Sequence, residues 1–331
     1  MEENTNPESD AFEKRVDLSR FKASLERVNE QIGSYIVGQR KAVELLQVAL
    51  IADGHVLIEG VPGIAKTQLA KLMARALDLD FSRVQFTPDL MPSDILGTSV
   101  YNQKQGEFEF KSGPVFSNVV LVDEINRAPA KTQAALFEVM EERQVTIDGH
   151  QHKMDEPYLI LATQNPIEQE GTYRLPEAQL DRFLFKISMD YPSLDEEFEI
   201  LKLHQSLESK PEAMIQKALS KDDIQELRAT AKQIHIEEDI LRYIAAIVDA
   251  TRNQGSLYLG ASPRASLALL NSARALAAIQ DRDFVSPDDI RFLAAPVLAH
   301  RVILSPEREM EGLSSVEVLD QIVRSIKVPG S

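Results

Sequence analysis

The sequence predicts an α/β domain built on a parallel sheet, followed by a C-terminal domain that is all helical. In the first part of the chain, short apolar runs alternate with helical periodicity, which is typical of a parallel sheet covered on both faces. Beyond residue 193 the periodicity is helical throughout. A glycine-rich turn directly follows the first apolar run, as at many ligand-binding edges of such sheets. The strand-like runs, most of them apolar, are residues 55–59, 81–86, 118–122, 157–163 and 183–189.

The chain of 331 residues divides into three predicted segments. Residues 1–16 are acidic and contain few apolar side chains, so we expect a mobile arm. Residues 17–191 form the predicted α/β domain, and residues 192–331 form the predicted helical domain. A helix over residues 39–52 and another before it should precede the first strand. The earlier helix is indicated by apolar residues that recur every three or four positions, namely Leu18, Phe21, Leu25, Val28 and Ile32.

Acidic side chains outnumber basic ones, 52 to 36, which gives a formal net charge of −16. Such a surface repels phosphate backbones and anionic lipid, which argues against general nucleic-acid binding and membrane docking. The absence of cysteine excludes disulfides, thiolate metal sites and cysteine nucleophiles. The apolar runs are far shorter than the ~20 residues of a membrane span, and the N-terminus has no signal-peptide pattern. We therefore expect a cytoplasmic protein with no membrane span.

The glycine-rich turn has the composition of a phosphate-binding loop. Between a strand and a helix, glycines let backbone N–H groups converge on phosphates, a lysine contacts the β- and γ-phosphates, and a hydroxyl serves Mg²⁺. The strict pattern has glycine where this chain has Ala65, and we expect alanine to enter the helix there. The alternative is a plain Gly-Pro turn. The loop residues are Gly60, Val61, Pro62, Gly63, Ile64, Ala65, Lys66 and Thr67.

Two adjacent carboxylates, Asp123 and Glu124, follow the buried strand that begins at Val119. An aspartate in this place can hold Mg²⁺, and a glutamate can activate water beside a γ-phosphate. The alternative is a strand that simply runs into an acidic loop. Because this pair and the phosphate-binding loop each lie at the carboxyl end of a strand, together they predict nucleotide binding at that edge of the sheet.

Three further polar residues are candidates for hydrolysis. Asn165 follows the strand over residues 157–163, where its amide could orient an attacking water, although an Asn-Pro turn is the alternative. Arg182 and Arg264 have the charge and geometry that stabilise a phosphoryl group in the transition state. For both arginines the alternative is an ordinary surface ion pair.

Three runs of residues give the chain a specific resemblance. These runs are EGVPGIAKT at 59–67, VDEINRAPAKTQ at 122–133 and LPEAQLDRF at 175–183. Together they resemble the MoxR family of AAA+ ATPases, in the helix-2-insert branch, and the likeness extends over residues 18–328. The resemblance implies an AAA+ P-loop domain with a parallel sheet, a C-terminal helical lid, and assembly into a homo-hexameric ring.

The resemblance also implies that ATP and Mg²⁺ are the ligands. Lys66 and Thr67 would serve the phosphates and the metal, Asp123 the metal, and Glu124 the attacking water. The positions at which such proteins contact adenine are Val37 and Gly38.

The remaining roles implied by the resemblance concern hydrolysis. Asn165 would be sensor 1, Arg182 the finger that reaches a neighbour's nucleotide, and Arg264 sensor 2 of the lid. Arg127 is a rival of Arg182 for the role in the neighbouring subunit's site.

Two segments match the inserts of the helix-2-insert branch. Residues 98–112 interrupt a helix and carry aromatic residues, and residues 144–154 read as a hairpin that turns at Asp148-Gly149. In a ring both would face the pore or the client. The alternative is that the aromatic residues only pack the insert onto its own domain.

The leading functional hypothesis is an ATP-hydrolysing, chaperone-like remodeller of protein clients, working with a partner that has a von Willebrand type A domain. One alternative is a nucleic-acid motor, which the hairpin disfavours because it has one lysine and no arginine or aromatic residue. Another is a nucleotide-dependent scaffold with little turnover, which the presence of Glu124, Asn165 and Arg182 argues against.

Overall fold

The computed structural model describes residues 17–165, 173, 175–206 and 215–329. Its central sheet has five parallel strands in the order β2–β5–β8–β1–β9. Each strand coincides with one of the five strand-like runs, so the predicted parallel sheet is confirmed. The strands are β1 (His55–Gly60), β2 (Phe81–Gln85), β5 (Val119–Asp123), β8 (Leu159–Gln164) and β9 (Phe183–Met189).

Helices cover both faces of this sheet, because successive side chains of a strand point to opposite faces. On β5, Val119 and Leu121 join the core cluster that contains the buried faces of three helices, whereas Val120 and Val122 join the cluster under a fourth. The first three helices are α1 (Ser19–Gly33), α2 (Arg40–Ile51) and α3 (Lys66–Ala76), and the fourth is α5 (Ala130–Glu142).

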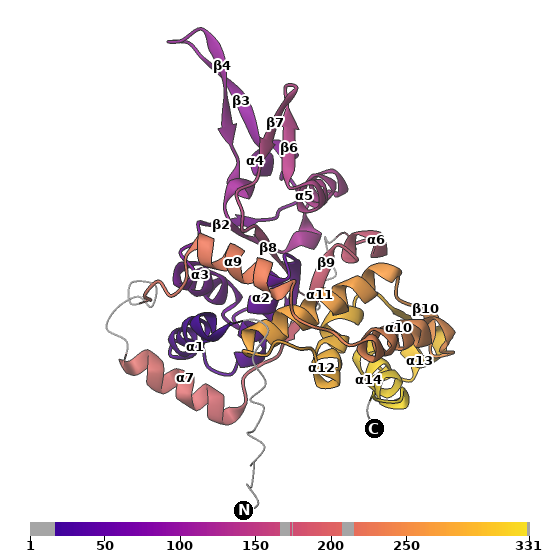
Figure 1. Ribbon diagram of the computed structural model, residues 1–331. Coiled ribbons are helices and arrows are strands. Elements are labelled where there is room, and N and C mark those ends of the chain that lie inside the picture. Colours follow the sequence, from indigo (N-terminus) through magenta and orange to yellow (C-terminus); the bar gives the residue numbers. More distant parts are fainter. Residues whose placement is uncertain (1–16, 166–172, 174, 207–214, 330–331) are drawn as a thin grey trace, which may run out of the picture.

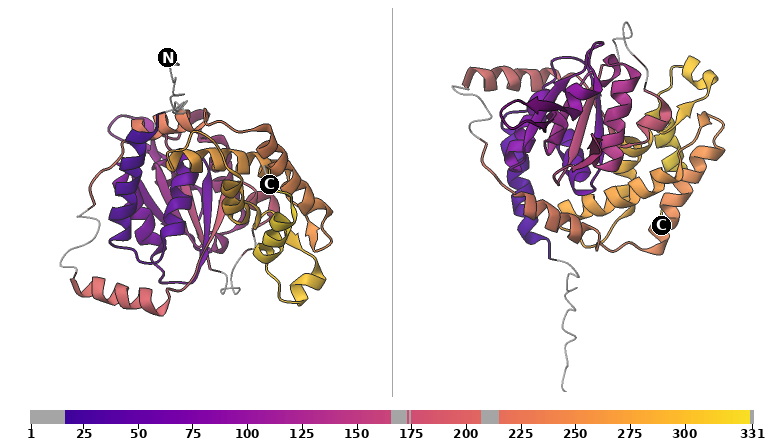
Figure 2. Two further views of the ribbon diagram at one scale, coloured as in Figure 1. Left: turned by 60° about the horizontal axis from the view of Figure 1, so that its bottom comes forward. Right: turned by 90° about the horizontal axis from the view of Figure 1, so that it is seen from above.

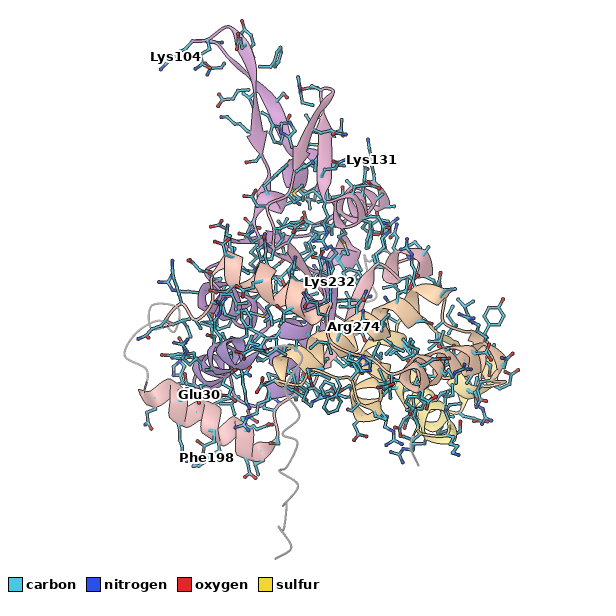
Figure 3. All side chains as sticks on the ribbon, in the orientation of Figure 1. Glu30, Lys104, Lys131, Phe198, Lys232 and Arg274 are labelled. Atoms are coloured by element: carbon cyan, nitrogen blue, oxygen red, sulfur yellow. The ribbon has the colours of Figure 1, made fainter. Side chains whose placement is uncertain are left out.

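Two β-hairpins project from one end of the α/β unit (Figure 1). The predicted turn at Asp148 and Gly149 is confirmed, since both residues have positive φ angles, 50° and 80°. The insert after β2 is also a hairpin, and Lys104 lies at its far end (Figure 3). The elements are α4 (Pro92–Leu96), β3 (Gly97–Asn102) with β4 (Glu107–Ser112), and β6 (Gln144–Ile147) with β7 (His150–Lys153).

The aromatic residues of the insert form two groups. Phe110 stacks on His152 of the other hairpin with ring centroids 4.0 Å apart, so this contact joins the hairpins to each other. Tyr101 and Phe108 pair with each other at 5.3 Å, and Phe108 is 74% exposed. Packing within the domain therefore accounts for Phe110, but not for the exposed pair.

The described C-terminal part is mainly helical, with a short antiparallel ladder between β10 (Leu257–Leu259) and β11 (Ile303–Leu304) and a single parallel bridge between His235 and Phe284. Capping boxes begin two of its helices, with Ser286 and Ser314 each accepting a backbone N–H three residues later. The helices are α10 (Glu238–Asn253), α11 (Pro263–Ile279), α12 (Pro287–Leu298), α13 (Pro306–Met310) and α14 (Ser315–Ser325).

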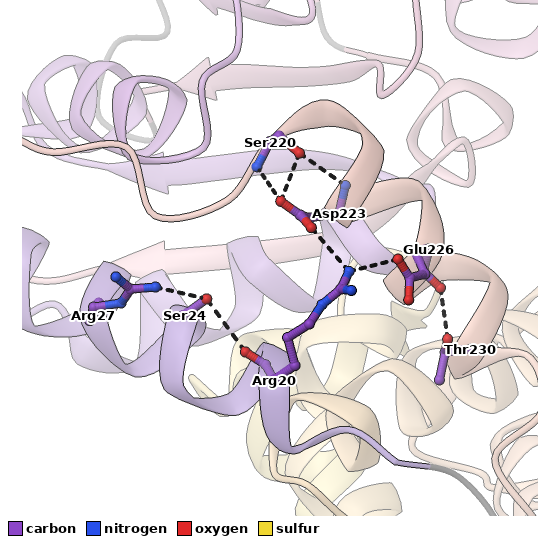
Figure 4. Close-up of polar contacts among 7 residues, drawn as sticks. All are labelled: Arg20, Ser24, Arg27, Ser220, Asp223, Glu226 and Thr230. Atoms are coloured by element: carbon purple, nitrogen blue, oxygen red, sulfur yellow. Dashed lines mark hydrogen bonds and ion pairs between the residues drawn. The ribbon is translucent and has the colours of Figure 1, made fainter.

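Two helices between β9 and α10 lie outside the group α10–α14. In both views of Figure 2, α7 (Leu194–Ser206) lies on the side of the α/β unit away from α10–α14. α9 (Lys221–Ala231) packs against α2 and the lid helix α11, and Arg20 of α1 contacts its Asp223 at 3.1 Å and its Glu226 at 2.6 Å (Figure 4). The segment predicted to be the lid thus also contributes a helix to the surface of the α/β unit.

Candidate active site

The strand register defines two opposite edges of the sheet. Gly60, the last residue of β1, pairs with Met189, whereas His55, its first residue, pairs with Phe183. Since all five strands are parallel, their carboxyl ends lie at one edge. This carboxyl edge brings together the loop that follows Gly60, the pair Asp123-Glu124 at the end of β5, and Asn165 after β8.

The phosphate-binding loop has the backbone conformation that its sequence requires. A Cβ on Gly60 would lie 2.6 Å from the Met189 carbonyl oxygen, so only glycine fits there. Gly63 and Ala65 both have positive φ, 88° and 63°. The expectation that Ala65 enters the helix is wrong, because α3 begins at Lys66 and Ala65 precedes it in the left-handed conformation. This conformation costs a non-glycine residue about 1–2 kcal/mol, which explains why the strict pattern has glycine.

Lys66 lies at the first position of α3 and is half-buried. Its Nζ donates a hydrogen bond to the Gly60 carbonyl oxygen at 2.6 Å, across the mouth of the loop. Burial lowers the pKa of Lys66 below its ordinary value, and the charges of Asp123 and Glu124 act in the opposite direction. The ammonium group is therefore within electrostatic range of both carboxylates and of the loop backbone.

Asp123 is buried and its carboxylate has two described partners. Thr163 on β8 donates to Oδ1 at 3.1 Å, and Arg83 on β2 donates from Nε to Oδ2 at 2.6 Å. Both neighbours come from the strands that flank β5 in the sheet. The carboxylate is thus fixed in position beside the loop, with a cation that offsets part of its charge.

Glu124 has φ +57°, which turns the chain sharply at the end of β5. Its N–H donates to the Thr163 hydroxyl at 3.0 Å. Its side chain accepts a hydrogen bond from Gln85 Nε2 at 2.5 Å and pairs with Arg127 Nε at 3.0 Å. In this structure the carboxylate is therefore held by polar side chains on either side.

The oxygen donors at this edge fit a nucleotide-bound Mg²⁺. Among the described residues, no group of three or more His, Cys, Asp or Glu side chains could hold a metal ion. Mg²⁺ in phosphoryl-transfer sites is typically bound by one or two protein oxygens together with phosphates and water. The hydroxyl of Thr67, next to Lys66, and the carboxylate of Asp123 match that donor set.

A cavity of about 550 Å³ extends from this edge toward the lid. Gly38, Ala42 and Leu45 line it from the α2 side, and Tyr191 and Pro296 from the other side. A smaller cavity at Gly60 and Val61 shares four lining residues with it. The segment that includes Val37 and Gly38 is thus connected to the phosphate-binding loop by a hollow of the size of a small ligand.

Arg182 and Arg264 do not lie at the carboxyl edge of the sheet. Arg182 directly precedes β9, so it belongs to the amino edge of the sheet, about 17 Å from Gly60 along β1. Its NH1 contacts Glu141 at 2.7 Å, and Arg264 NH2 contacts the same carboxylate at 3.0 Å. Glu141 follows Met140, whose carbonyl oxygen is 3.1 Å from Nε2 of His55. Both arginines therefore lie at the opposite edge from the loop of their own chain.

Sequence reasoning missed the residues that support these groups. Arg83 and Gln85 occupy alternate positions on β2 and reach Asp123 and Glu124 only because β2 pairs with β5. Two polar residues in a short strand were the available signal. Glu141 carried no signal, since nothing in a helix sequence indicates which loops its end will meet.

The fold and the site together define an AAA+ ATPase. Residues 55–185 match the model of the ATPase family associated with various cellular activities, and residues 249–322 match the AAA lid domain. A crystal structure from Cytophaga hutchinsonii superimposes with a TM-score of 0.86 and 43% identity, covering 93% of this chain and 96% of that one.

Curated relatives narrow the family. Chaperone MoxR1 of Mycobacterium tuberculosis is 44% identical, over 92% of this chain and 82% of its own length. Protein MoxR of Paracoccus denitrificans is 30% identical, over 95% of this chain and 99% of its own length. The uncharacterised protein YeaC of Bacillus subtilis is 47% identical, over 91% of this chain and 93% of its own length. This chain therefore belongs to the MoxR family of AAA+ ATPases. In the part of the chain that the structure describes, no helix is long and apolar enough to span a membrane.

Proposed function

We propose that this chain hydrolyses ATP as a Mg²⁺-dependent ring and uses the energy to remodel protein clients. The observation that supports this proposal is that the candidate catalytic residues of one chain lie at two opposite edges of the sheet. The loop, Asp123 and Glu124 lie at the carboxyl edge, whereas Arg182 and Arg264 lie at the amino edge. One chain alone cannot bring both sets to a single phosphate, so a second copy must supply the arginines.

Within one subunit the proposed roles follow from position. Lys66 binds the β- and γ-phosphates once its hydrogen bond to Gly60 is exchanged for them. Thr67 and Asp123 hold Mg²⁺, which supplies charge neutralisation of the phosphate oxygens. Glu124 takes the proton from the attacking water, and Asn165 orients that water. Gly38, which lines the cavity beside α2, and the adjacent Val37 contact the base.

Among the contacts that the structure describes, Glu124 keeps one carboxylate oxygen, Oε1, that can take the proton from the attacking water. Its hydrogen bond with Gln85 and its ion pair with Arg127 both occupy the same oxygen, Oε2. Arg127 therefore belongs to the site of its own subunit in this structure. That placement supports Arg182, rather than Arg127, as the finger that serves the neighbour.

The client-binding part of the proposal rests on the two hairpins. They project away from the nucleotide-binding body, and the Tyr101–Phe108 pair is exposed on one of them. Exposed aromatic pairs supply apolar contact area for a polypeptide client. We further propose, as the family resemblance implies, that a partner with a von Willebrand type A domain assists this chain and that both act in the cytoplasm.

The experiment that tests the ring is light scattering at micromolar protein concentration. With Glu124→Gln to prevent turnover, ATP and Mg²⁺ should convert a small species into a hexamer, because a nucleotide that bridges subunits favours assembly by mass action. ADP should promote this less. A particle mass that is the same with and without ATP would contradict the proposal. Clients should co-purify with the ATP-loaded Glu124→Gln ring and not with Lys66→Ala.

A further inference from the structure

One carboxylate joins the two arginines at the amino edge of the sheet. Glu141 Oε2 accepts from Arg182 NH1 at 2.7 Å, and Glu141 Oε1 pairs with Arg264 NH2 at 3.0 Å. Each arginine thus has its own oxygen of the same group. Arg182 also donates from NH1 to the Phe137 carbonyl oxygen at 3.4 Å, one turn earlier on α5.

The backbones that carry these arginines are also tied together. Asp181, directly before Arg182, accepts from Ser262 Oγ at 3.1 Å, and Ser262 is the N-cap of the helix that begins with Pro263 and Arg264. The other oxygen of Asp181 accepts from the buried Arg301 at 2.7 Å. The two arginines therefore stand on one rigid joint between the sheet and the lid.

Two guanidinium groups on such a joint repel each other unless an anion lies between them. Glu141 supplies that anion within the chain. A carboxylate and a phosphoryl group present oxygens to arginine in the same way, and arginine pairs with both in bidentate geometry. The space between Arg182 and Arg264 is therefore built for an oxyanion and is filled here by a side chain of the same subunit.

We propose that Glu141 is a resident anion of the arginine site, and that the γ-phosphate of a neighbouring subunit's nucleotide displaces its carboxylate on assembly. This inference rests on the proposed function, because it requires that the arginines act on a second copy. Glu141 is then a positioning residue that keeps the arginine pair together before the neighbour binds and competes with the incoming phosphate.

Because the three side chains are partly exposed, replacing the Glu141 carboxylate by a phosphate costs little free energy. Glu141 is 39% exposed, and Arg182 and Arg264 are 31% and 57% exposed in their side chains. Ion pairs of this kind are weak, since solvent screens them. The carboxylate can therefore leave without unfolding the end of α5, yet its departure must be offset by the contacts that the phosphate makes.

The test measures ATP turnover per subunit as the protein concentration is raised, for the wild type and for Glu141→Gln. Glutamine keeps the shape and removes the competing charge. The concentration at half-maximal turnover should fall roughly 3- to 30-fold, as expected for two exposed ion pairs that no longer oppose assembly. Light scattering measures how much Glu141→Gln promotes assembly. This effect should be smaller with ADP than with ATP, because ADP lacks the phosphate that replaces the carboxylate.

Glu142 is the matched control, since it is adjacent, exposed, and without an ion pair among the residues that the structure describes. Glu142→Gln removes the same charge and should leave the half-maximal concentration within twofold. In an Arg264→Ala background the effect of Glu141→Gln should shrink, because one of its two pairs is already absent.

Two outcomes would overturn the inference. The first is an unchanged or raised half-maximal concentration in Glu141→Gln. The second is an equal effect of Glu141→Gln on assembly with ATP and with ADP, measured by light scattering, which a purely structural effect would give. If turnover of the wild type does not depend on concentration at all, the proposed assembly fails instead, so the two failures are distinguishable.

Discussion

The guanidinium of Arg301 donates from Nε to Oδ1 of Asp181 across 2.7 Å, and this pair fastens the lid to the start of β9. The Arg301 side chain is only 4% exposed. It also donates to the carbonyl oxygens of Phe183 and Leu184. Since Asp181 precedes Arg182 in the chain, the position of the lid and the position of the proposed finger are set by the same contacts.

Replacing Arg301 with methionine should therefore destabilise the protein strongly. Asp181 would lose its charged partner and the two carbonyl oxygens would each lose one donor, although His300 still donates to Phe183. Breaking a buried pair by removing one partner typically costs about 3–5 kcal/mol. Urea denaturation measures the loss. Arg242→Met is the control, because its pair with Glu238 has both side chains more than 70% exposed and should cost less than about 1 kcal/mol. Equal losses in the two variants would contradict the structural role of Arg301.

His55 should make the stability of the protein depend on pH. The ring accepts from the Ile160 N–H at Nδ1 and lies 3.1 Å from the Met140 carbonyl oxygen at Nε2, which fits the neutral imidazole with its proton on Nε2. Burial, reinforced by the charge of Arg143, lowers the pKa of His55 to about 3. A second proton on Nδ1 would face the Ile160 N–H.

The direction in which stability changes with pH follows from proton binding by His55. Between pH 6.5 and pH 3 the unfolded chain binds a proton at this residue and the native state does not, so stability falls as the pH falls through this range. At pH 5 the loss from His55 should be about 2 kcal/mol. Urea denaturation at pH 7.5 and pH 5 should show a smaller difference for His55→Gln than for the wild type, whatever its stability at pH 7.5. The same pH dependence in both proteins would contradict the assignment.

Lys66 and Glu124 should affect ATP in separable ways. Lys66→Ala removes the cation at the loop, so nucleotide binding should collapse in a filter or fluorescence assay. Glu124→Gln keeps the shape but removes the base, so ATP should bind while turnover falls by roughly 10²–10⁴-fold. Gln85→Ala serves as a control for the polar environment of Glu124, because it leaves the carboxylate in place. Wild-type turnover in Glu124→Gln would show that another residue is the base.

Mixing two inactive variants should restore activity if Arg182 acts on the neighbouring subunit. Rings that contain both Arg182→Ala and Lys66→Ala subunits include interfaces with an intact loop on one side and an intact arginine on the other. Turnover should therefore appear on mixing, at a fraction of the wild-type rate. The assignment to the neighbouring site would be wrong if no turnover appeared in rings that demonstrably exchange subunits.

The sequence alone determined the local features of this protein. The central strands β5 and β8 were recognisable because a strand buried on both faces needs an almost unbroken apolar run, whereas β2, with Arg83 and Gln85, is more polar. The phosphate-binding loop was recognisable because its chemistry depends on neighbouring residues of one short segment. The same holds for the pair Asp123-Glu124. Even here the conformation of Ala65 was not predictable, since alanine alone gives no sign of a positive φ.

Tertiary structure decided which distant residues share a site. Arg83 reaches Asp123 only because β2 pairs with β5, and that strand order is set by packing over the whole sheet. Arg182 and Arg264 meet on Glu141 because β9 and the lid helix begin at the same edge. Contacts of this kind join segments far apart in the chain, and their cost in chain entropy is repaid only when the complete core forms. The sequence could therefore name the arginines, but only the fold shows that they lie together, at the edge of the sheet away from their own phosphate-binding loop.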